Sequence, residues 1–269
     1  METIPSLRPW HWSLPLILAV LTAPLWLGVF EPKVFYFFNR HLQALPDIVW
    51  SLLSLLGTGW GILALSSPAL WLRPRLVLAW LCAAPLAGVL TRVGKTWAYS
   101  ARPLEVLDPS TIHVIGEPLY VAAMPSGHTL TAFAAATALY FALPVRHRNR
   151  HLWLWGVALG VGLSRMAVGA HWPADVSMGA VLGLLSGLCG VWLCGRIPLR
   201  HQQVQGWPAR VIALLGLYAM YVLLTDPMGF VQNMPYQYGL AAFLGLNLAL
   251  FGVRTFRPPS LASTPTGTP

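Results

Sequence analysis

Residues 164–195 read SRMAVGAHWPADVSMGAVLGLLSGLCGVWLCG, a polar stretch that leads into a long apolar one. The apolar part, from about residue 175 to residue 195, has the length that an α-helix needs to cross a bilayer. The polar part places Arg165, His171 and Asp175 next to the start of that helix. Ionisable groups are costly at membrane depth and commonly mark functional sites there. The stretch therefore predicts a membrane fold with chemistry at the lipid–water boundary.

The composition extends this pattern to the whole chain. Of 269 residues, 56% are hydrophobic and 9% are charged, against roughly 25% charged in soluble domains. Such a chain has too little polar surface to cover a water-soluble globule, so we expect an all-α integral membrane protein. Eight segments are transmembrane-helix candidates, with seven or nine as alternatives: roughly 13–30, 48–72, 75–93, 128–144, 152–170, 175–195, 208–225 and 236–253. Pro68 lies in the second segment, which we expect to tilt or to end early.

The first apolar segment resembles a signal peptide, because Arg8 and His11 precede it. It is long for the apolar region of a signal peptide, however. It also leads into Phe30-Glu31-Pro32-Lys33 without a small-x-small cleavage site. We therefore interpret it as a retained first helix.

Charged residues divide unevenly between the two sides of the predicted bundle. With the N-terminus in the cytoplasm and eight helices, eleven of the 17 basic residues lie on the cytoplasmic side. Seven of the eight acidic residues lie on the other side. This follows the positive-inside rule and places both termini in the cytoplasm. We expect a multi-pass protein of the bacterial inner (plasma) membrane whose polar motifs face the periplasm. The net charge of +9 then reflects topology and attraction to lipid surfaces, not nucleic-acid binding.

Two further polar motifs lie at the ends of apolar segments on the same predicted side: Lys95-x6-Arg102-Pro103 and Pro125-Ser126-Gly127-His128. Phosphoryl transfer spreads negative charge over the equatorial oxygens, so its site must present several fixed donors and cations. Lys95 offers a point charge, and Arg102 and Arg165 can each bind two oxygens. The motifs together therefore favour a phosphate-binding site.

The Pro-Ser-Gly-His motif adds backbone donors to these cations. Ser126 and Gly127 precede a helix that we expect to begin near His128, and the N-terminus of a helix binds anions through free N–H groups. Glycine also lets the backbone approach a phosphate closely. The chain has no aspartate cluster suited to Mg²⁺, so we expect the cations to replace a metal and no cofactor to be used. The three cysteines lack metal-binding spacing, and we interpret them as core residues: Cys82, Cys189 and Cys194.

Two histidines can divide the remaining chemistry. Asp175 follows His171 closely enough for its carboxylate to hold one ring nitrogen, which leaves the other free to attack phosphorus. His128, at the mouth of its helix, can protonate the departing oxygen. The predicted scheme has two steps: a phospho-histidine forms on His171, and water then hydrolyses it.

In this order the three motifs resemble the signature of the type 2 phosphatidic acid phosphatase superfamily, which also contains vanadium haloperoxidases and some acid phosphatases. Its pattern is Lys-x6-Arg-Pro, Pro-Ser-Gly-His and Ser-Arg-x5-His-x3-Asp, and this chain matches it at every position. The resemblance covers about residues 45–195 and implies a helical phosphatase core. It implies the roles already derived, without a metal: catalytic His171, His128 and Asp175, and substrate-binding Lys95, Arg102, Ser126, Gly127 and Arg165.

The resemblance also divides the chain. Residues 1–45 are expected to form an N-terminal segment with the first transmembrane helix, and residues 46–195 a six-helix phosphatase core. Residues 196–253 are expected to add about two transmembrane helices, for which the minimal six-helix members have no counterpart. Residues 254–269, rich in Pro, Ser and Thr, are expected to be disordered.

Several functions fit these motifs. The leading one is hydrolysis of a lipid phosphate or pyrophosphate of the undecaprenyl pyrophosphate or phosphatidylglycerol phosphate type. The alternatives are a lipid A phosphatase, a lipid A phosphotransferase and, further away, a non-catalytic membrane transporter. A haloperoxidase is disfavoured because the known examples are much larger soluble proteins. The loop at 104–124, on the predicted outer side and called the outer loop below, carries Glu105, Asp108 and Glu117, which suit a highly anionic lipid A headgroup poorly. The motifs do not indicate an oligomeric state.

Overall fold

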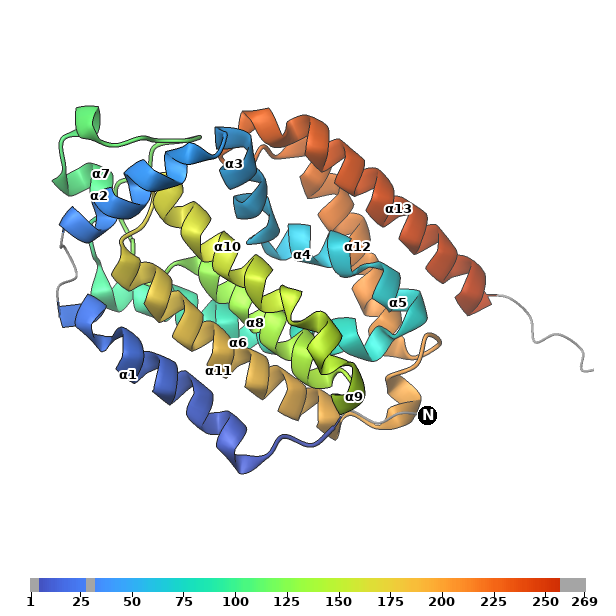
Figure 1. Ribbon diagram of the computed structural model, residues 1–269. Helices are drawn as coiled ribbons and strands as arrows, with labels where there is room; N and C mark the ends of the chain where they lie inside the picture. The colour runs from blue at the N-terminus through green and yellow to red at the C-terminus, as the bar shows by residue number, and fades with distance from the viewer. Residues whose placement is uncertain (1–4, 28–31, 257–269) are drawn as a thin grey trace, which may run out of the picture.

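The computed structural model describes residues 5–27 and 32–256, and within these ranges the chain forms a bundle of helices without a strand (Figure 1). The elements that coincide with predicted apolar segments are α1 (Leu14–Leu27), α3 (Asp47–Leu56), α4 (Gly59–Ser66), α5 (Pro68–Leu72), α6 (Pro74–Ala98), α8 (Gly127–Ala142), α10 (Trp153–Ala167), α11 (Pro173–Arg196), α12 (Trp207–Thr225) and α13 (Met234–Phe256). The others are α2 (Pro32–His41), α7 (Pro103–Val106), α9 (Val145–Arg148) and short 3₁₀ turns that include η6 (Val231–Asn233). The predicted all-α fold is confirmed.

The described helices include five stretches that are long and apolar enough to cross a membrane, or six if the bent pair α3 and α4 is one span. The chain is thus a multi-pass membrane protein, but the predicted eight spans exceed this number. The difference lies in α8 and α10, which have 16 and 15 residues, whereas a span needs about 20. α8 packs between α6, α10 and α11, in the interior of the bundle.

The second predicted segment is bent at a different place from the one expected. α3 ends at Gly57, and Thr58 caps α4 by accepting the N–H of Gly61 at 2.9 Å. The axes of α3 and α4 differ by 79°, whereas Pro68 simply begins α5. A Cβ atom on Gly57 would lie 2.9 Å from the Cβ of His128. Glycine therefore lets this bend approach the start of α8 closely.

Close packing of α8 against α11 positions the beginnings of both helices. Gly179, Gly183 and Gly187 recur every four residues along the face of α11 that meets α8. A Cβ on Gly183 would lie 2.6 Å from the carbonyl oxygen of Leu130, and one on Gly179 would lie 2.6 Å from that of Ser126. Small residues at this spacing let two membrane helices approach backbone to backbone. The start of α8 is thereby held against the first turns of α11.

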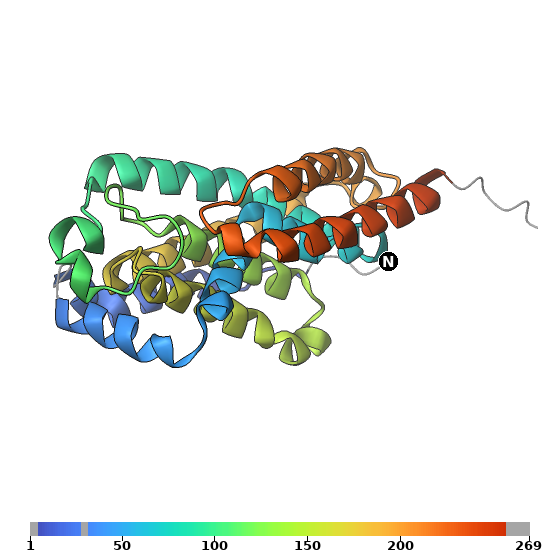
Figure 2. The same cartoon turned by 90° about the horizontal axis from the view of Figure 1, so that it is seen from above.

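Helix α2 was not predicted, because its apolar run, residues 34–38, is far too short to cross a membrane. It lies with α7 at the end of the bundle where α6 ends (Figures 1 and 2). Phe35 is fully buried, and the amide nitrogen of Asn39 donates to the carbonyl oxygens of His113, Met166 and Ala167 at 3.0–3.2 Å. α2 therefore fixes the end of α10 and the loop that follows α7.

The C-terminal helices α12 and α13 pack against each other and against α4, on the opposite side of the bundle from α1 (Figure 1). α13 continues through Phe256, so the first residues of the predicted disordered tail are helical. Residues 257–269 of that tail lie outside the described residues.

Candidate active site

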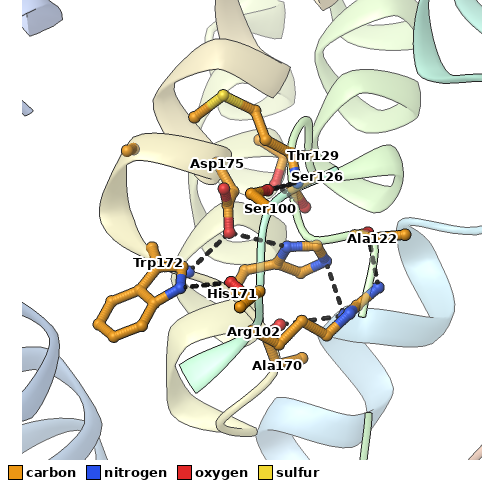
Figure 3. A network of polar contacts seen from close by, with 12 residues as sticks. Ser100, Arg102, Ala122, Ser126, Thr129, Ala170, His171, Trp172 and Asp175 are labelled. Atoms are coloured by element: carbon orange, nitrogen blue, oxygen red, sulfur yellow. Dashed lines mark hydrogen bonds and ion pairs between the residues drawn. The ribbon is translucent and has the colours of Figure 1, made fainter. Parts of the chain in front are cut away.

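The three polar motifs meet at one end of the bundle. Lys95 lies in the last turn of α6, Arg102 begins the loop that contains α7, and Ser126 to His128 begin α8. Arg165 lies in the last turn of α10, His171 lies in the loop after it, and Asp175 lies in the first turn of α11. Figure 3 shows Arg102, Ser126, His171 and Asp175 together. Helix ends from four parts of the chain thus assemble one polar cluster.

The hydrogen bonds of His171 define the tautomer of its ring. Nε2 lies 3.3 Å from Nη1 of Arg102, and Nδ1 lies 3.3 Å from Oδ2 of Asp175 (Figure 3). A guanidinium has only N–H donors, so the nitrogen facing Arg102 must be the one without a proton. Nδ1 therefore carries the proton and donates it to the carboxylate. The lone pair of Nε2 is left on the side of the ring where the cations lie.

Asp175 links the second and third motifs. Its Oδ2 also accepts the backbone N–H of Trp172 at 2.9 Å, and its carbonyl oxygen accepts the N–H of Ser126 at 3.0 Å. The residue is fully buried, and its Oδ1 has no hydrogen-bond partner. This carboxylate is consequently held in place from two directions while it orients His171.

Arg165 is a buried cation with spare donors. It is 2% exposed, and its Nη1 donates to the hydroxyl of Ser54 at 2.8 Å. Its Nε has no hydrogen-bond partner, and the side chain of Lys95 forms no hydrogen bond or ion pair with any described residue. A buried charge is normally paired, because isolated burial of an ion is costly. Cations held together without enough carboxylates therefore indicate a site for an anion.

Arg102 is positioned by the backbone around it. Its side chain donates to the carbonyl oxygens of Val121, Ala122 and Ala170 at 2.8, 3.3 and 3.0 Å. These acceptors lie on two loops, one before α8 and one before α11. Arg102 therefore ties the loop before α8 to the loop that carries His171.

The start of α8 supplies backbone donors. Ser126 has extended backbone geometry at the N-cap, and its hydroxyl accepts a hydrogen bond from Thr129 at 2.9 Å. The hydroxyl does not cap the helix, so the first N–H groups of α8 are available to an anion. Gly127 leaves space for an anion to approach the backbone closely, and the nearest side chain is that of Thr91.

Sequence reasoning missed Ser54 and Asn39. Ser54 bonds to Arg165 and also lies 3.0 Å from the hydroxyl of Ser164, so it positions the cation across α3 and α10. The sequence feature that could have indicated Ser54 is a polar residue within an apolar segment.

The described part of the chain contains no group of three or more His, Cys, Asp or Glu side chains suited to a metal ion. Its three cysteines are free thiols.

Two cavities adjoin the cluster. The larger, of about 740 Å³, has Lys95 and His128 in its wall together with Trp60, Trp80 and Ala84. Trp80 and Lys95 are 15 residues apart on α6, so this cavity extends along the helix for about 22 Å. The smaller, of about 190 Å³, is lined by His128, Arg165 and loop residues such as Leu104 and Ala170. The polar cluster is thus continuous with a long, mostly apolar groove.

Fold and site together define a helical membrane protein with a cationic, histidine-containing site at one end of its bundle. The sequence profile of the PAP2 superfamily matches residues 76–197, the part of the chain that runs from α6 to the end of α11. Among solved structures, the fold is similar to the crystal structure of Aquifex aeolicus LpxE, with a TM-score of 0.52 and 26% identity over 60% of this chain and 93% of that one.

Three curated relatives are also similar. The bacitracin transport permease protein BcrC of Bacillus licheniformis is 37% identical over 81 residues, 30% of this chain and 37% of that protein. The lipid A 1-phosphatase of Porphyromonas gingivalis is 40% identical over 73 residues, 26% of this chain and 16% of that protein. The undecaprenyl-diphosphatase of Sulfolobus acidocaldarius is 33% identical over 100 residues, 36% of this chain and 45% of that protein. The matched segments span less than half of each relative.

Proposed function

We propose that this protein is a membrane lipid phosphatase that forms a phospho-histidine on His171. Its active site faces the periplasm. The observation that carries the proposal is the placement of the His171 ring, with Nδ1 3.3 Å from Asp175 and Nε2 3.3 Å from Arg102. A neutral imidazole held in this way is a nucleophile, and the neighbouring cations can bind the phosphate that it attacks.

The reaction follows from these positions. The lone pair of Nε2 forms a bond to phosphorus while the bond from phosphorus to the departing lipid oxygen breaks. Lys95, Arg102, Arg165 and the first N–H groups of α8 stabilise the charge on the equatorial oxygens. His128 donates a proton to the departing oxygen. It then accepts a proton from a water molecule that attacks phosphorus, and the N–P electron pair returns to Nε2 as phosphate leaves.

The shape of the larger cavity favours a lipid substrate with a slender apolar part. Its apolar walls along α6 suit a prenyl or acyl chain, and its polar end holds Lys95 and His128. Arg92, one turn before Lys95, lines the same cavity and can contact a second phosphate. These features favour a prenyl pyrophosphate or a glycerophospholipid phosphate as the substrate. The similarity to undecaprenyl-diphosphatase adds support.

The second candidate function is that of a lipid A phosphatase, because the relative from Porphyromonas gingivalis is a lipid A 1-phosphatase.

Purified protein should therefore be assayed for phosphate release from undecaprenyl pyrophosphate, phosphatidylglycerol phosphate, phosphatidic acid and lipid A, with and without a lipid acceptor. We expect release from one of the first three. Release from lipid A alone would reverse the choice, transfer to the acceptor would indicate a phosphotransferase, and no release from any lipid would contradict the proposal.

The fall of kcat/KM at acid pH should follow the protonation of His171. Burial, followed by the charges of Arg102, Arg165 and Lys95, holds the pKa of this imidazole well below its ordinary value of 6.5. Attack needs the neutral ring, so activity is lost only where the pH falls through that lowered pKa. Arg102→Gln removes one of the cations, and its acid limb should move to higher pH. Profiles of the two enzymes on one substrate share the ionisation of the phosphate, so an unchanged limb would mean that another group titrates.

Activity should survive metal chelation. The site offers three cations and a helix N-terminus to the phosphate, and none of the described residues form an acidic cluster. An excess of EDTA should leave kcat within about twofold, whereas vanadate should inhibit by occupying the site of the pentacoordinate phosphorus. If EDTA abolished activity and Mg²⁺ restored it, the proposal that the three cations replace a metal would be wrong.

The proposed topology predicts a labelling pattern. In a chain whose native cysteines are replaced by serine, Asp108→Cys should react with a membrane-impermeant thiol reagent in intact cells. Arg150→Cys, in the basic segment between α9 and α10, should react only after lysis. Both positions are exposed, so accessibility within the protein is matched. The reverse pattern would place the chemistry in the cytoplasm.

A further inference from the structure

The turn between α12 and α13 lies against the active site, although it is outside the matched segment 76–197. Met228 in this turn lines the larger cavity beside Lys95 and the smaller one beside Arg165. His128 also lines both cavities. Met228 therefore borders the space on the side of the residue that would protonate the leaving group.

The turn is anchored in the hydrophobic packing behind the catalytic loop. Phe230 is 7% exposed and packs in one cluster with Trp50 of α3, Ile115 and the residues just before His171, Val168 and Ala170. An aromatic side chain buried in this way provides a large packing area. The position of the turn is thus coupled to the loop that carries the nucleophile.

The backbone of the turn contacts the outer loop directly. The N–H of Glu117 donates to the carbonyl oxygen of Gly229 at 2.9 Å. Gly116 has φ of +81°, and a Cβ on it would lie 2.3 Å from that same oxygen. Only glycine permits this conformation and this approach without strain. The outer loop and the α12–α13 turn are therefore built to fit together.

Further bonds hold both ends of the turn. The N–H of Met228 donates to Oδ1 of Asp226 at 2.7 Å. Beyond the turn, Asn233 donates to the carbonyl oxygen of Ser51 and accepts from its hydroxyl, at 2.9 and 2.8 Å. Met228 itself has φ of +50°, a conformation that non-glycine residues seldom adopt. A strained residue that is held so firmly next to a reaction site points to a functional constraint.

We infer that the α12–α13 turn is a wall of the substrate site, in which Met228 limits the bulk of the leaving group next to the transferred phosphate. The inference rests on the proposed phosphatase activity. It assigns the C-terminal helices a role in selecting among lipids by the number of chains close to the phosphate. Lipids with one slender chain fit beside Met228, and lipids branched at that point are restricted.

The test compares one-chain and two-chain lipids that carry the same phosphate group. Lysophosphatidic acid is paired with phosphatidic acid, and farnesyl pyrophosphate with diacylglycerol pyrophosphate. Met228→Ala should raise the ratio of kcat/KM for the two-chain lipid to that for the one-chain lipid by about tenfold, because space opens beside the phosphate. Met228→Trp should lower the ratio by a similar factor.

Val231→Ala is the matched control. Val231 lies in the same turn, is 70% exposed and lines neither cavity. The ratio of kcat/KM for two-chain and one-chain lipids should be the same in this variant as in the wild type. The melting temperatures of all variants show whether they are folded. A wild type that hydrolyses one pair while both folded Met228 variants keep its ratio would overturn the inference alone. A wild type that hydrolyses neither pair and releases no phosphate from the lipid panel would overturn the phosphatase proposal as well.

Discussion

Replacement of His171 by alanine is expected to lower kcat/KM for a lipid phosphate by about 10⁴-fold or more, because the atom that attacks phosphorus is removed. His128→Ala removes only the proton donor. It should therefore retain hydrolysis of esters with good leaving groups, such as p-nitrophenyl phosphate, far better than hydrolysis of lipids. Steady-state kinetics of both variants on both classes of substrate separate the two roles.

His113 offers a matched control for these variants. It is a histidine in the outer loop that bonds to Asp47 at 2.8 Å, away from the catalytic cluster. His113→Ala should keep kcat/KM within about threefold of the wild type, as expected of a partly exposed pair. Substantial turnover by a folded His171→Ala variant would refute the assignment of the nucleophile.

Replacement of Arg165 by glutamine is expected to lower kcat by about 10³-fold, because a buried cation that meets the charge of the transition state is lost. The guanidinium is held by Ser54 and is 2% exposed, so its charge is weakly screened by water. The same change also removes a buried cation without a full complement of partners. Thermal stability should therefore be unchanged or higher, in contrast to activity.

Two variants refine this second prediction. Arg165→Lys keeps the charge but not the forked donors, and it should recover only part of the lost rate. Ser54→Ala removes one positioning hydrogen bond and should cost about tenfold in kcat. If Arg165→Gln lost stability and activity in parallel, the role of Arg165 would be structural, and the anion site would have to depend on Lys95 and Arg102.

The sequence predicted the helical membrane fold and the polar cluster because both depend on local patterns. Apolar runs specify helices whatever their partners are, and the motif residues sit where those helices end. Lys95 was placed just beyond its helix, yet α6 continues through Ala98. That difference of one turn moves the lysine onto the wall of the larger cavity.

The remaining features depend on contacts between distant parts of the chain. Ser54 reaches Arg165 across 111 positions, and Asn39 holds the end of α10 from a helix whose apolar run is too short to predict a span. The need for glycine at position 57 follows from the proximity of His128, which no local pattern records. Met228 likewise lines a cavity together with His128 only because α12 and α13 pack on α4. Such positions are defined by tertiary packing and could not be read from spacing.

The covalent step can be measured directly. Wild-type protein mixed with lipid carrying a ³²P-labelled terminal phosphate should be quenched within milliseconds under alkaline denaturing conditions and digested. We expect acid-labile, base-stable label on the peptide that contains His171, and none in His171→Ala. Rapid phosphate release with no labelled peptide at any quench time, or label on another residue, would show that His171 is not the nucleophile.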